Sequence, residues 1–217
     1  MTTGKRVVVF ISGSGSNMMA LLAATRAPDY PAEIVAVISD KPDAGGLQKA
    51  GVEGVPTFAF ERKAYAGKAE HEAAILAKLD ELQPDFLCLA GYMRLLSGHF
   101  IGRYEGRILN IHPSLLPLFP GLHTHERAIE AGMRVSGCTV HFVTPGMDEG
   151  PVIGQAVVPI LPGDTPDALA ARVLTVEHRL YPEALRRVAT GDVSMTKDGK
   201  VFSADAAFAP DGYLISL

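Results

Sequence analysis

The chain has 217 residues, 47% of them hydrophobic and 20% charged, which are ordinary values for one folded globular domain. Its net charge is −4 and its Lys and Arg residues are scattered, so no basic surface for nucleic acid or an anionic membrane is indicated. No apolar stretch reaches the length of a membrane span. Cys88 and Cys138 stand in apolar runs, as buried free thiols do in a reducing compartment. We therefore expect a cytoplasmic protein that binds neither nucleic acid nor membrane.

Short apolar runs alternate with helical patterns in the first half of the chain. The expected helices span 16–25 and 63–82, and the expected strands span 6–11, 33–39, 56–60, 85–90 and 106–112. The run 85–90 is apolar on both faces, as in a buried parallel strand. The alternation predicts an α/β fold in which an open, mostly parallel, twisted sheet carries helices on both faces.

The pattern changes after residue 113. Two longer β runs, a long helix and a hairpin are expected at 135–143, 151–160, 166–188 and 193–203. They predict antiparallel β additions in the C-terminal half. Because no linker or repeat divides the chain, we expect a single domain over 1–217. It would consist of an N-terminal half of about 1–105, a C-terminal half of about 106–190 and a tail of about 191–217.

A Gly-rich segment, Ser-Gly-Ser-Gly-Ser-Asn at 12–17, connects the first expected strand to the first helix. Glycines allow close backbone approach to an anion, and the free N–H groups at the start of a helix favour phosphate. The segment is no P-loop, because no Gly-Lys-Ser/Thr follows it. It is also a poor dinucleotide fingerprint, because Met18 stands where the third glycine would be. Asp40, at the end of the second expected strand, therefore supports dinucleotide binding only weakly. A plain turn capped by Ser16 or Asn17 is the alternative.

Asn110 and His112 share one face at the C-terminal end of an expected strand, because side chains alternate along a strand. Open α/β sheets bind their ligands at this end. An amide donor beside an imidazole suits a carbonyl under attack, since one group stabilises the oxyanion and the other moves protons. A structural histidine before Pro113 is the alternative.

Two acidic residues are further candidates. Asp148 lies in the Gly/Pro-rich segment 146–151, where an Asp is most often only a turn residue. Glu177 falls inside the apolar stripe of the last long helix, where a carboxylate is unusual unless it is paired or used. The expected stripe consists of Leu169, Val173, Val176, Leu180 and Ala184.

The histidines give a weaker signal. His123 and His125 lie in the Pro/Gly-punctuated segment 116–130 and indicate a mobile active-site loop in place of a metal site. The remaining four are interpreted as structural or surface residues, and they are His71, His99, His141 and His178.

Five motifs together resemble the phosphoribosylglycinamide formyltransferases, a family of folate-dependent enzymes of purine synthesis. The motifs are Ile-Ser-Gly-Ser-Gly-Ser-Asn at 11–17, Leu-Ala-Gly-Tyr-Met-Arg-Leu-Leu at 89–96, Leu-Asn-Ile-His-Pro-Ser-Leu-Leu-Pro at 109–117, Pro-Gly-Leu-His-Thr-His at 120–125, and His-Phe-Val-Thr with Asp-Glu-Gly-Pro-Val-Ile within 141–153. The resemblance runs from about residue 6 to 188, and it implies a Rossmann-like formyltransferase fold.

The resemblance also implies a role for each candidate residue. Asn110, His112 and Asp148 match the family's catalytic residues. The residues that match the ribonucleotide site are Gly15, Ser16 and Asn17 for its phosphate and Glu177 for its ribose. Those that match the folate site are Lys68, Met93, Arg94, Leu95, Leu96 and Asn110. Lys68 stands where the family usually has Arg, which keeps the charge but loses the bidentate fork.

The implied reaction transfers the formyl group of 10-formyltetrahydrofolate, a co-substrate, to the amine of N1-(5-phospho-D-ribosyl)glycinamide (glycinamide ribonucleotide). The amine would attack directly through a tetrahedral species, with no metal. Asn110 and charged His112 would stabilise the oxyanion, and Asp148 would keep His112 charged and oriented. The expected partners are small-molecule substrates, and the chain would be a monomer or a homodimer.

Other activities remain open on the sequence alone. A formyltetrahydrofolate hydrolase would usually carry an N-terminal regulatory domain, and a methionyl-tRNA formyltransferase would need an additional C-terminal domain and a basic surface. A non-catalytic nucleotide- or folate-binding module would not require Asn110, His112 and Asp148 together. A dinucleotide-dependent oxidoreductase agrees least with the Gly-rich segment.

Overall fold

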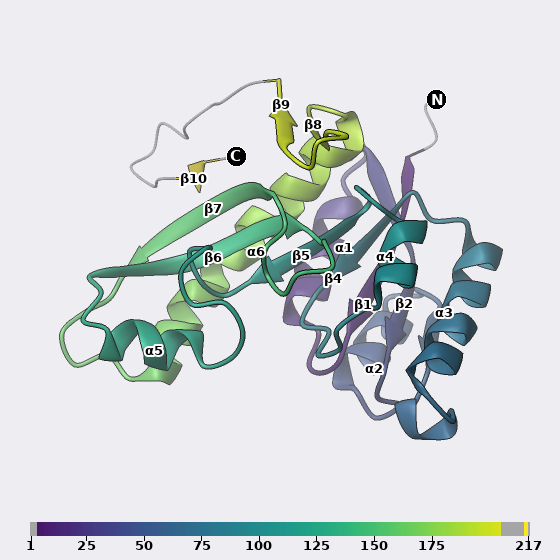
Figure 1. Cartoon of the computed structure of the whole chain (residues 1–217), viewed down its shortest axis with the longest axis horizontal. Coiled ribbons are helices and arrows are strands. Elements are labelled where there is room, and N and C mark those ends of the chain that lie inside the picture. The colour runs from purple at the N-terminus through teal and green to yellow at the C-terminus, as the bar shows by residue number, and fades with distance from the viewer. Residues whose placement is uncertain (1–3, 205–214, 217) are drawn as a thin grey trace. The chain divides into compact units, whose positions relative to one another are not determined.

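The computed structural model describes residues 4–204 and 215–216 (Figure 1). The chain divides into two compact units, Met1–Leu109 (unit 1) and Asn110–Leu217 (unit 2). Within the described residues, no helix is both long enough and apolar enough to span a bilayer.

Unit 1 is a parallel sheet with helices. Its elements are β1 (Lys5–Ile11), α1 (Ser16–Thr25), β2 (Ala32–Ser39), α2 (Gly45–Val52), β3 (Thr57–Ala59), a 3-10 turn (Arg62–Ala64), α3 (Lys68–Leu82), β4 (Phe86–Leu89), α4 (Gly98–Arg103) and the first residues of β5 (Ile108–His112). The strand order is β4-β1-β2-β3, and the neighbouring strands are parallel. Residues 7–11 of β1 are fully buried, as expected at the centre of a sheet that is covered on both faces.

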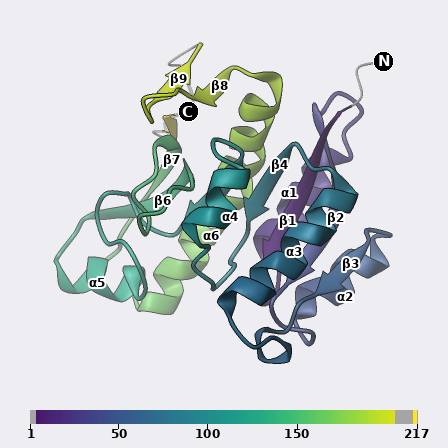
Figure 2. The ribbon, with the colours of Figure 1, turned by 45° about the vertical axis from the view of Figure 1, so that its right-hand side comes forward.

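The strand order reverses direction between β1 and β4. The chain moves outward from β1 to β3 and then returns to the other side of β1. Because parallel crossovers are right-handed, α1 and α3 must cover opposite faces of the sheet. In Figure 2, α3 lies in front of β1 and β2. The carboxyl ends of β1 and β4 therefore form a switch point, where open α/β sheets bind ligands.

Unit 2 is mainly antiparallel. Beyond the end of β5, its elements are α5 (Thr124–Glu130), β6 (Val135–Phe142), β7 (Val152–Pro159), α6 (Pro166–Thr190), β8 (Val193–Met195), β9 (Val201–Ser203) and β10 (Ile215–Ser216). Its strand order is β10-β7-β6-β5, and β7 runs antiparallel to both β6 and β10. The hairpin β8–β9 is a separate small sheet, and α6 packs on β6, β7 and α5.

Helix α6 has a capping residue at each end. The Thr165 hydroxyl accepts a hydrogen bond from the Ala168 N–H, and Gly191 ends the helix in the left-handed conformation. The inward stripe that was predicted is largely confirmed, including the burial of Glu177, which is 6% exposed. Val176, however, is only half-buried.

The predicted fold class is confirmed, with the parallel sheet and its helices in unit 1 and the antiparallel additions in unit 2. The predicted start of α3 at residue 63 was wrong, because 62–64 form a separate turn and the helix begins at Lys68. Three helices, α2, α4 and α5, were not predicted. The first two are short and contain glycines, which weaken the helical signal. The organisation as a single domain stays a prediction.

Candidate active site

The end of β5 places His112 beside Asp148. His112 is 6% exposed. Its Nδ1 lies 3.5 Å from Asp148 Oδ2, and its Nε2 lies 3.1 Å from the Phe119 carbonyl oxygen. A protonated ring would therefore have an acceptor near each nitrogen. The structure brings together the two residues whose pairing the family resemblance implied.

Asp148 is held by its own backbone and by the loop that follows β5. Its φ of 56° lies in the left-handed region, which is uncommon for a residue other than glycine. Its Oδ2 accepts a hydrogen bond of 2.8 Å from the Gly121 N–H. One carboxylate oxygen thus contacts both the imidazole and the loop backbone.

Asn110 is oriented by His141, a residue of β6. The Nδ1 of His141 lies 2.9 Å from the Phe142 carbonyl oxygen, so it must carry the hydrogen. Burial is the main cause that lowers the pKa of His141, which keeps the ring neutral near pH 7 and its Nε2 an acceptor. The Nδ2 of Asn110, 3.1 Å away, donates to this nitrogen and retains a second N–H.

His141 also connects Asn110 with the other two residues. Its Nε2 lies 4.0 Å from Asp148 Oδ1. Gly150 is required nearby, because a Cβ there would lie 1.6 Å from the Phe142 carbonyl oxygen that fixes the His141 tautomer. Asn110, His112, Asp148 and His141 thus form one cluster in unit 2. From the sequence, His141 was interpreted only as a structural or surface residue, because its contact with Asn110 depends on the pairing of β5 with β6.

The loop after β5 is held in place from several sides. The Thr139 hydroxyl donates to the Ser114 carbonyl (2.7 Å) and accepts from the Leu116 N–H (3.0 Å). Arg127 donates to the Pro120 and Leu122 carbonyls at 2.6 and 3.2 Å. These contacts position the backbone that meets His112 and Asp148. The expected mobility of 116–130 stays a prediction.

The two histidines of this loop differ in their surroundings. His123 is exposed and lies 3.5 Å from Glu126. His125 is partly buried, and its Nδ1 has no hydrogen-bond partner among the described residues. Burial, the larger cause, and His112 both lower the pKa of His125.

In unit 1, the Gly-rich segment enters α1 at Gly15, whose φ is 71°. Gly15 is the N-cap, no side chain caps the helix, and its first turn has no acidic residue. The alternative of a turn capped by Ser16 or Asn17 is therefore wrong. A Cβ at Gly15 would lie 2.8 Å from Met18 Cε and 3.0 Å from Gly46 Cα. The geometry suits an anion at the start of α1.

The segment 93–96, expected to bind folate, follows β4 at the switch point. Met93 and Leu95 are 64% and 68% exposed, although both are large and apolar. The Met93 N–H donates a hydrogen bond of 2.8 Å to the hydroxyl of Ser12, the residue that follows β1. This bond holds the backbone of Met93 against the end of β1. Exposed apolar side chains on a fixed backbone suit a flat aromatic ligand such as a pterin.

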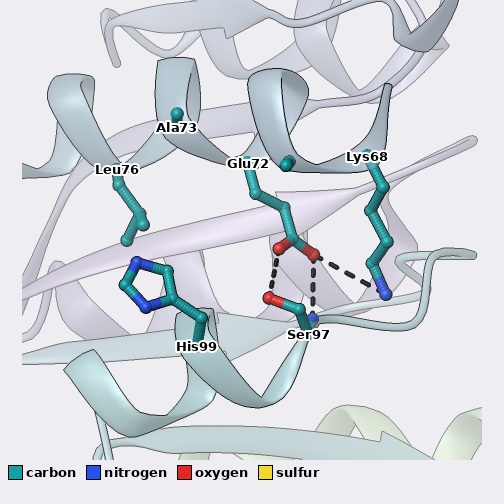
Figure 3. A pocket seen from close by; sticks show the side chains of 7 residues that line it. Lys68, Glu72, Ala73, Leu76, Ser97 and His99 are labelled. Carbon is teal, nitrogen blue, oxygen red and sulfur yellow. Dashed lines mark hydrogen bonds and ion pairs between the residues drawn. The ribbon is translucent and has the colours of Figure 1, made fainter.

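Lys68 lies at the rim of a cavity of about 510 Å³ within unit 1 (Figure 3). The cavity is lined by Lys68, Ala69, Glu72, Ala73, Leu76, Ser97 and His99. Glu72 accepts hydrogen bonds from the Ser97 hydroxyl and, at 2.8 Å, from the Ser97 N–H, and it lies 3.8 Å from Lys68 Nζ. Lys68 is half exposed at this rim.

Glu177 faces the interior of unit 2 from α6. Burial is the main cause that raises the pKa of the Cys138 thiol, and the charge of Glu177 is the second. The burial of Glu177 agrees with the helical periodicity, whereas its expected contact with ribose stays a prediction.

Comparisons with known proteins identify the family. Residues 5–185 match the formyl transferase family. The chain is 42% identical over 207 residues to the phosphoribosylglycinamide formyltransferase of Escherichia coli, and the match covers 95% of this chain and 97% of that protein. The chain also matches trifunctional purine biosynthetic proteins adenosine-3, but it spans only about a fifth of their length. The protein from Gallus gallus is 46% identical, and the match covers 92% of this chain and 20% of that protein. The protein from Homo sapiens is 47% identical, and the match covers 90% of this chain and 19% of that protein.

Solved structures agree with the sequence matches. The crystal structure of phosphoribosylglycinamide formyltransferase from Brucella melitensis is 66% identical, with a TM-score of 0.85, and the match covers 87% of this chain and 97% of that one. Glycinamide ribonucleotide transformylase 1 from Symbiobacterium toebii is 46% identical, with a TM-score of 0.89 and coverages of 93% and 95%. The chain therefore belongs to the formyl transferase family.

Proposed function

We propose that the chain is an enzyme that transfers the formyl group of 10-formyltetrahydrofolate to the amine of glycinamide ribonucleotide. The observation that carries this proposal is the cluster at the end of β5, where Asp148 lies 3.5 Å from His112 and Asn110 keeps a free amide hydrogen. Relatives that match nearly the whole chain carry the name phosphoribosylglycinamide formyltransferase, which supports the same reaction.

The cluster supplies what acyl transfer to an amine requires. Attack by the neutral amine makes the formyl carbon tetrahedral and leaves negative charge on its oxygen. The second N–H of Asn110 and the charged ring of His112 stabilise that charge. Because Nδ1 of His112 faces Asp148, its Nε2 is the nitrogen that serves the substrate in place of the Phe119 carbonyl.

The Nε2 of His112 also transfers the proton that the reaction moves from the attacking nitrogen to the leaving nitrogen. The attacking nitrogen loses one proton and the departing folate nitrogen gains one, so the reaction needs no net acid or base. His112 Nε2 donates to the leaving nitrogen, directly or through water, and the attacking amine restores the proton. Asp148 favours the charged ring throughout, because a nearby carboxylate stabilises an imidazolium.

The remaining residues bind the two substrates. The N–H groups at Gly15, Ser16 and Asn17 bind the phosphate, and Glu177 binds the ribose. The folate is bound by Lys68, the segment 93–96 and Asn110. The open start of α1 and the exposed apolar side chains of Met93 and Leu95 fit these ligands. We place the reaction in the cytoplasm, a reducing compartment that suits the buried cysteines Cys88 and Cys138, which form no disulfide.

The phosphate assignment predicts a selective effect of Gly15→Ala. The methyl group would meet Met18 and Gly46 and distort the N–H groups, so the KM for the ribonucleotide is expected to rise about tenfold, equivalent to about 1.4 kcal/mol. Gly54→Ala is the matched control, because Gly54 also has a positive φ, of 77°, but open space around it. Steady-state kinetics with both variants gives the answer, and equal KM values would contradict the assignment.

The ribose assignment predicts that Glu177→Gln weakens binding of the ribonucleotide by about 1–3 kcal/mol, as for a lost hydrogen bond to a charged group. Calorimetric titration with the ribonucleotide measures this loss. Glu183→Gln is the control, because Glu183 lies on the same helix, is partly exposed and lies 3.9 Å from Arg186. If both variants bind like the wild type, Glu177 is only a structural residue.

The function itself is tested by following loss of formyl groups from 10-formyltetrahydrofolate with and without glycinamide ribonucleotide. We expect turnover only when the ribonucleotide is present, with one N-formyl product for each formyl group lost. Turnover without the ribonucleotide would instead identify a hydrolase. Binding of both ligands without turnover would identify a non-catalytic module.

A further inference from the structure

Asp40 is a buried carboxylate that the reaction described above does not use. It follows β2 at the carboxyl edge of the sheet in unit 1 and is 3% exposed. Its Oδ1 accepts a hydrogen bond of 2.5 Å from the Ser12 hydroxyl, and its Oδ2 accepts one of 2.7 Å from Arg94 Nε. Both oxygens are thus engaged by protein groups, which argues against the dinucleotide role considered from the sequence.

The Ser12 hydroxyl extends this contact to the backbone. It has a single hydrogen, which it gives to Asp40, so its lone pairs are left to accept from the Met93 N–H at 2.8 Å. The Ser12 N–H in turn donates to the Gly91 carbonyl at 3.1 Å. One carboxylate therefore sets both the backbone of Met93 and the guanidinium of Arg94.

A second buried carboxylate holds the other end of the same segment. Glu72, 5% exposed, accepts hydrogen bonds from the N–H and the hydroxyl of Ser97. The segment 93–96 is thus fixed at both ends while Met93 and Leu95 protrude between them. Such a segment is ordered before a ligand arrives, and binding then costs less conformational entropy.

We propose that Asp40 is a positioning residue for the folate, acting through Ser12 and Arg94 on the segment 93–96. This inference rests on the proposed function of that segment. In this role Asp40 makes no contact with the reacting atoms. Loss of the Asp40 carboxylate should therefore change the KM for 10-formyltetrahydrofolate and leave kcat at saturation nearly unchanged.

The test compares Asp40→Asn with Asp80→Asn. Asparagine keeps the shape of Asp40 but removes the charge that orients Arg94. We expect the KM for 10-formyltetrahydrofolate to rise about tenfold, with kcat and the KM for the ribonucleotide within about twofold of the wild type. Asp80→Asn removes another Asp–Arg pair of unit 1, also 2.7 Å long but half exposed, and should change none of the three constants.

Ser12→Ala is a second and smaller change. It breaks the connection to Met93 and leaves the Asp40–Arg94 pair in place, so it should raise the same KM by a smaller factor. The proposal is overturned if both folded variants keep the wild-type folate KM, or if kcat and both KM values worsen together. If Asp40→Asn does not fold, Ser12→Ala alone decides between these outcomes.

A failure of the proposed function is recognised separately. It would appear as a wild-type chain that transfers no formyl group to the ribonucleotide. Calorimetric binding of tetrahydrofolate then tests the positioning role directly. Binding weakened about tenfold by Asp40→Asn but not by Asp80→Asn supports the role, and equal binding by both variants overturns it.

Discussion

Asp148→Asn is expected to lower kcat by about 10²–10³, the usual cost of losing one electrostatic stabiliser of a transition state. The variant keeps the shape of the side chain and its contact with the Gly121 N–H, and it removes the negative charge 3.5 Å from His112 Nδ1. The ring of His112 then loses the partner that favours its charged form. Asp164→Asn is the control, because Asp164 is an ion-paired residue of the same unit that lies outside the cluster.

The cause of this loss is measured by a double-mutant cycle of kcat over Asp148 and His112. Because the two residues act as a unit, adding Asp148→Asn to His112→Ala should lower kcat little further. Losses that simply multiply would mean that Asp148 acts without His112.

Asn110→Ala is expected to lower kcat by a similar factor, about 10²–10³, because it removes the amide donor to the oxyanion. His141→Ala should have a smaller effect, since it leaves that donor present but not oriented. Combining the two changes should cost little more than Asn110→Ala alone. Steady-state kcat values of the three variants test this, and a double variant with fully multiplied losses would show that His141 acts independently of Asn110.

The state of His141 can be checked by its own titration. Burial lowers the pKa of this residue, so the ring should stay neutral as the pH falls to values at which an exposed histidine is already protonated. Below that folded-state pKa, Nε2 would carry a hydrogen and could no longer accept from Asn110. NMR signals of a neutral Nδ1–H ring at pH 7 are expected, and an imidazolium there would contradict the tautomer inferred from the Phe142 contact.

The parts of the site that sequence alone predicts are those set by local periodicity. Alternation along β5 placed Asn110 and His112 on one face, and the helical period of α6 placed Glu177 toward the interior. Neither period can show which segments meet. The pairing of Asp148 with His112 depends on a left-handed turn and on the Gly121 N–H, and the contact of His141 with Asn110 depends on strand pairing.

Asp40 is a second case in which the sequence cannot show which segments meet. Its position after the second strand is also the position of the ribose-binding carboxylate in dinucleotide sites. Only the structure shows that Ser12 and Arg94, which are far from it in sequence, occupy both oxygens. The short helices α2 and α4 were not predicted for a different reason. Their glycines lower the intrinsic helix propensity, and tertiary packing stabilises the helices in the folded chain.

The central claim is that Asn110 and His112 stabilise the formyl oxygen while Asp148 stabilises His112. A crystal structure of the chain with glycinamide ribonucleotide and a formyl-bearing folate analogue tests it most directly. We predict a formyl oxygen within hydrogen-bond distance of Asn110 Nδ2 and His112 Nε2, with Nδ1 still facing Asp148. A formyl group bound away from these atoms, or a His112 ring turned from Asp148, would contradict the account.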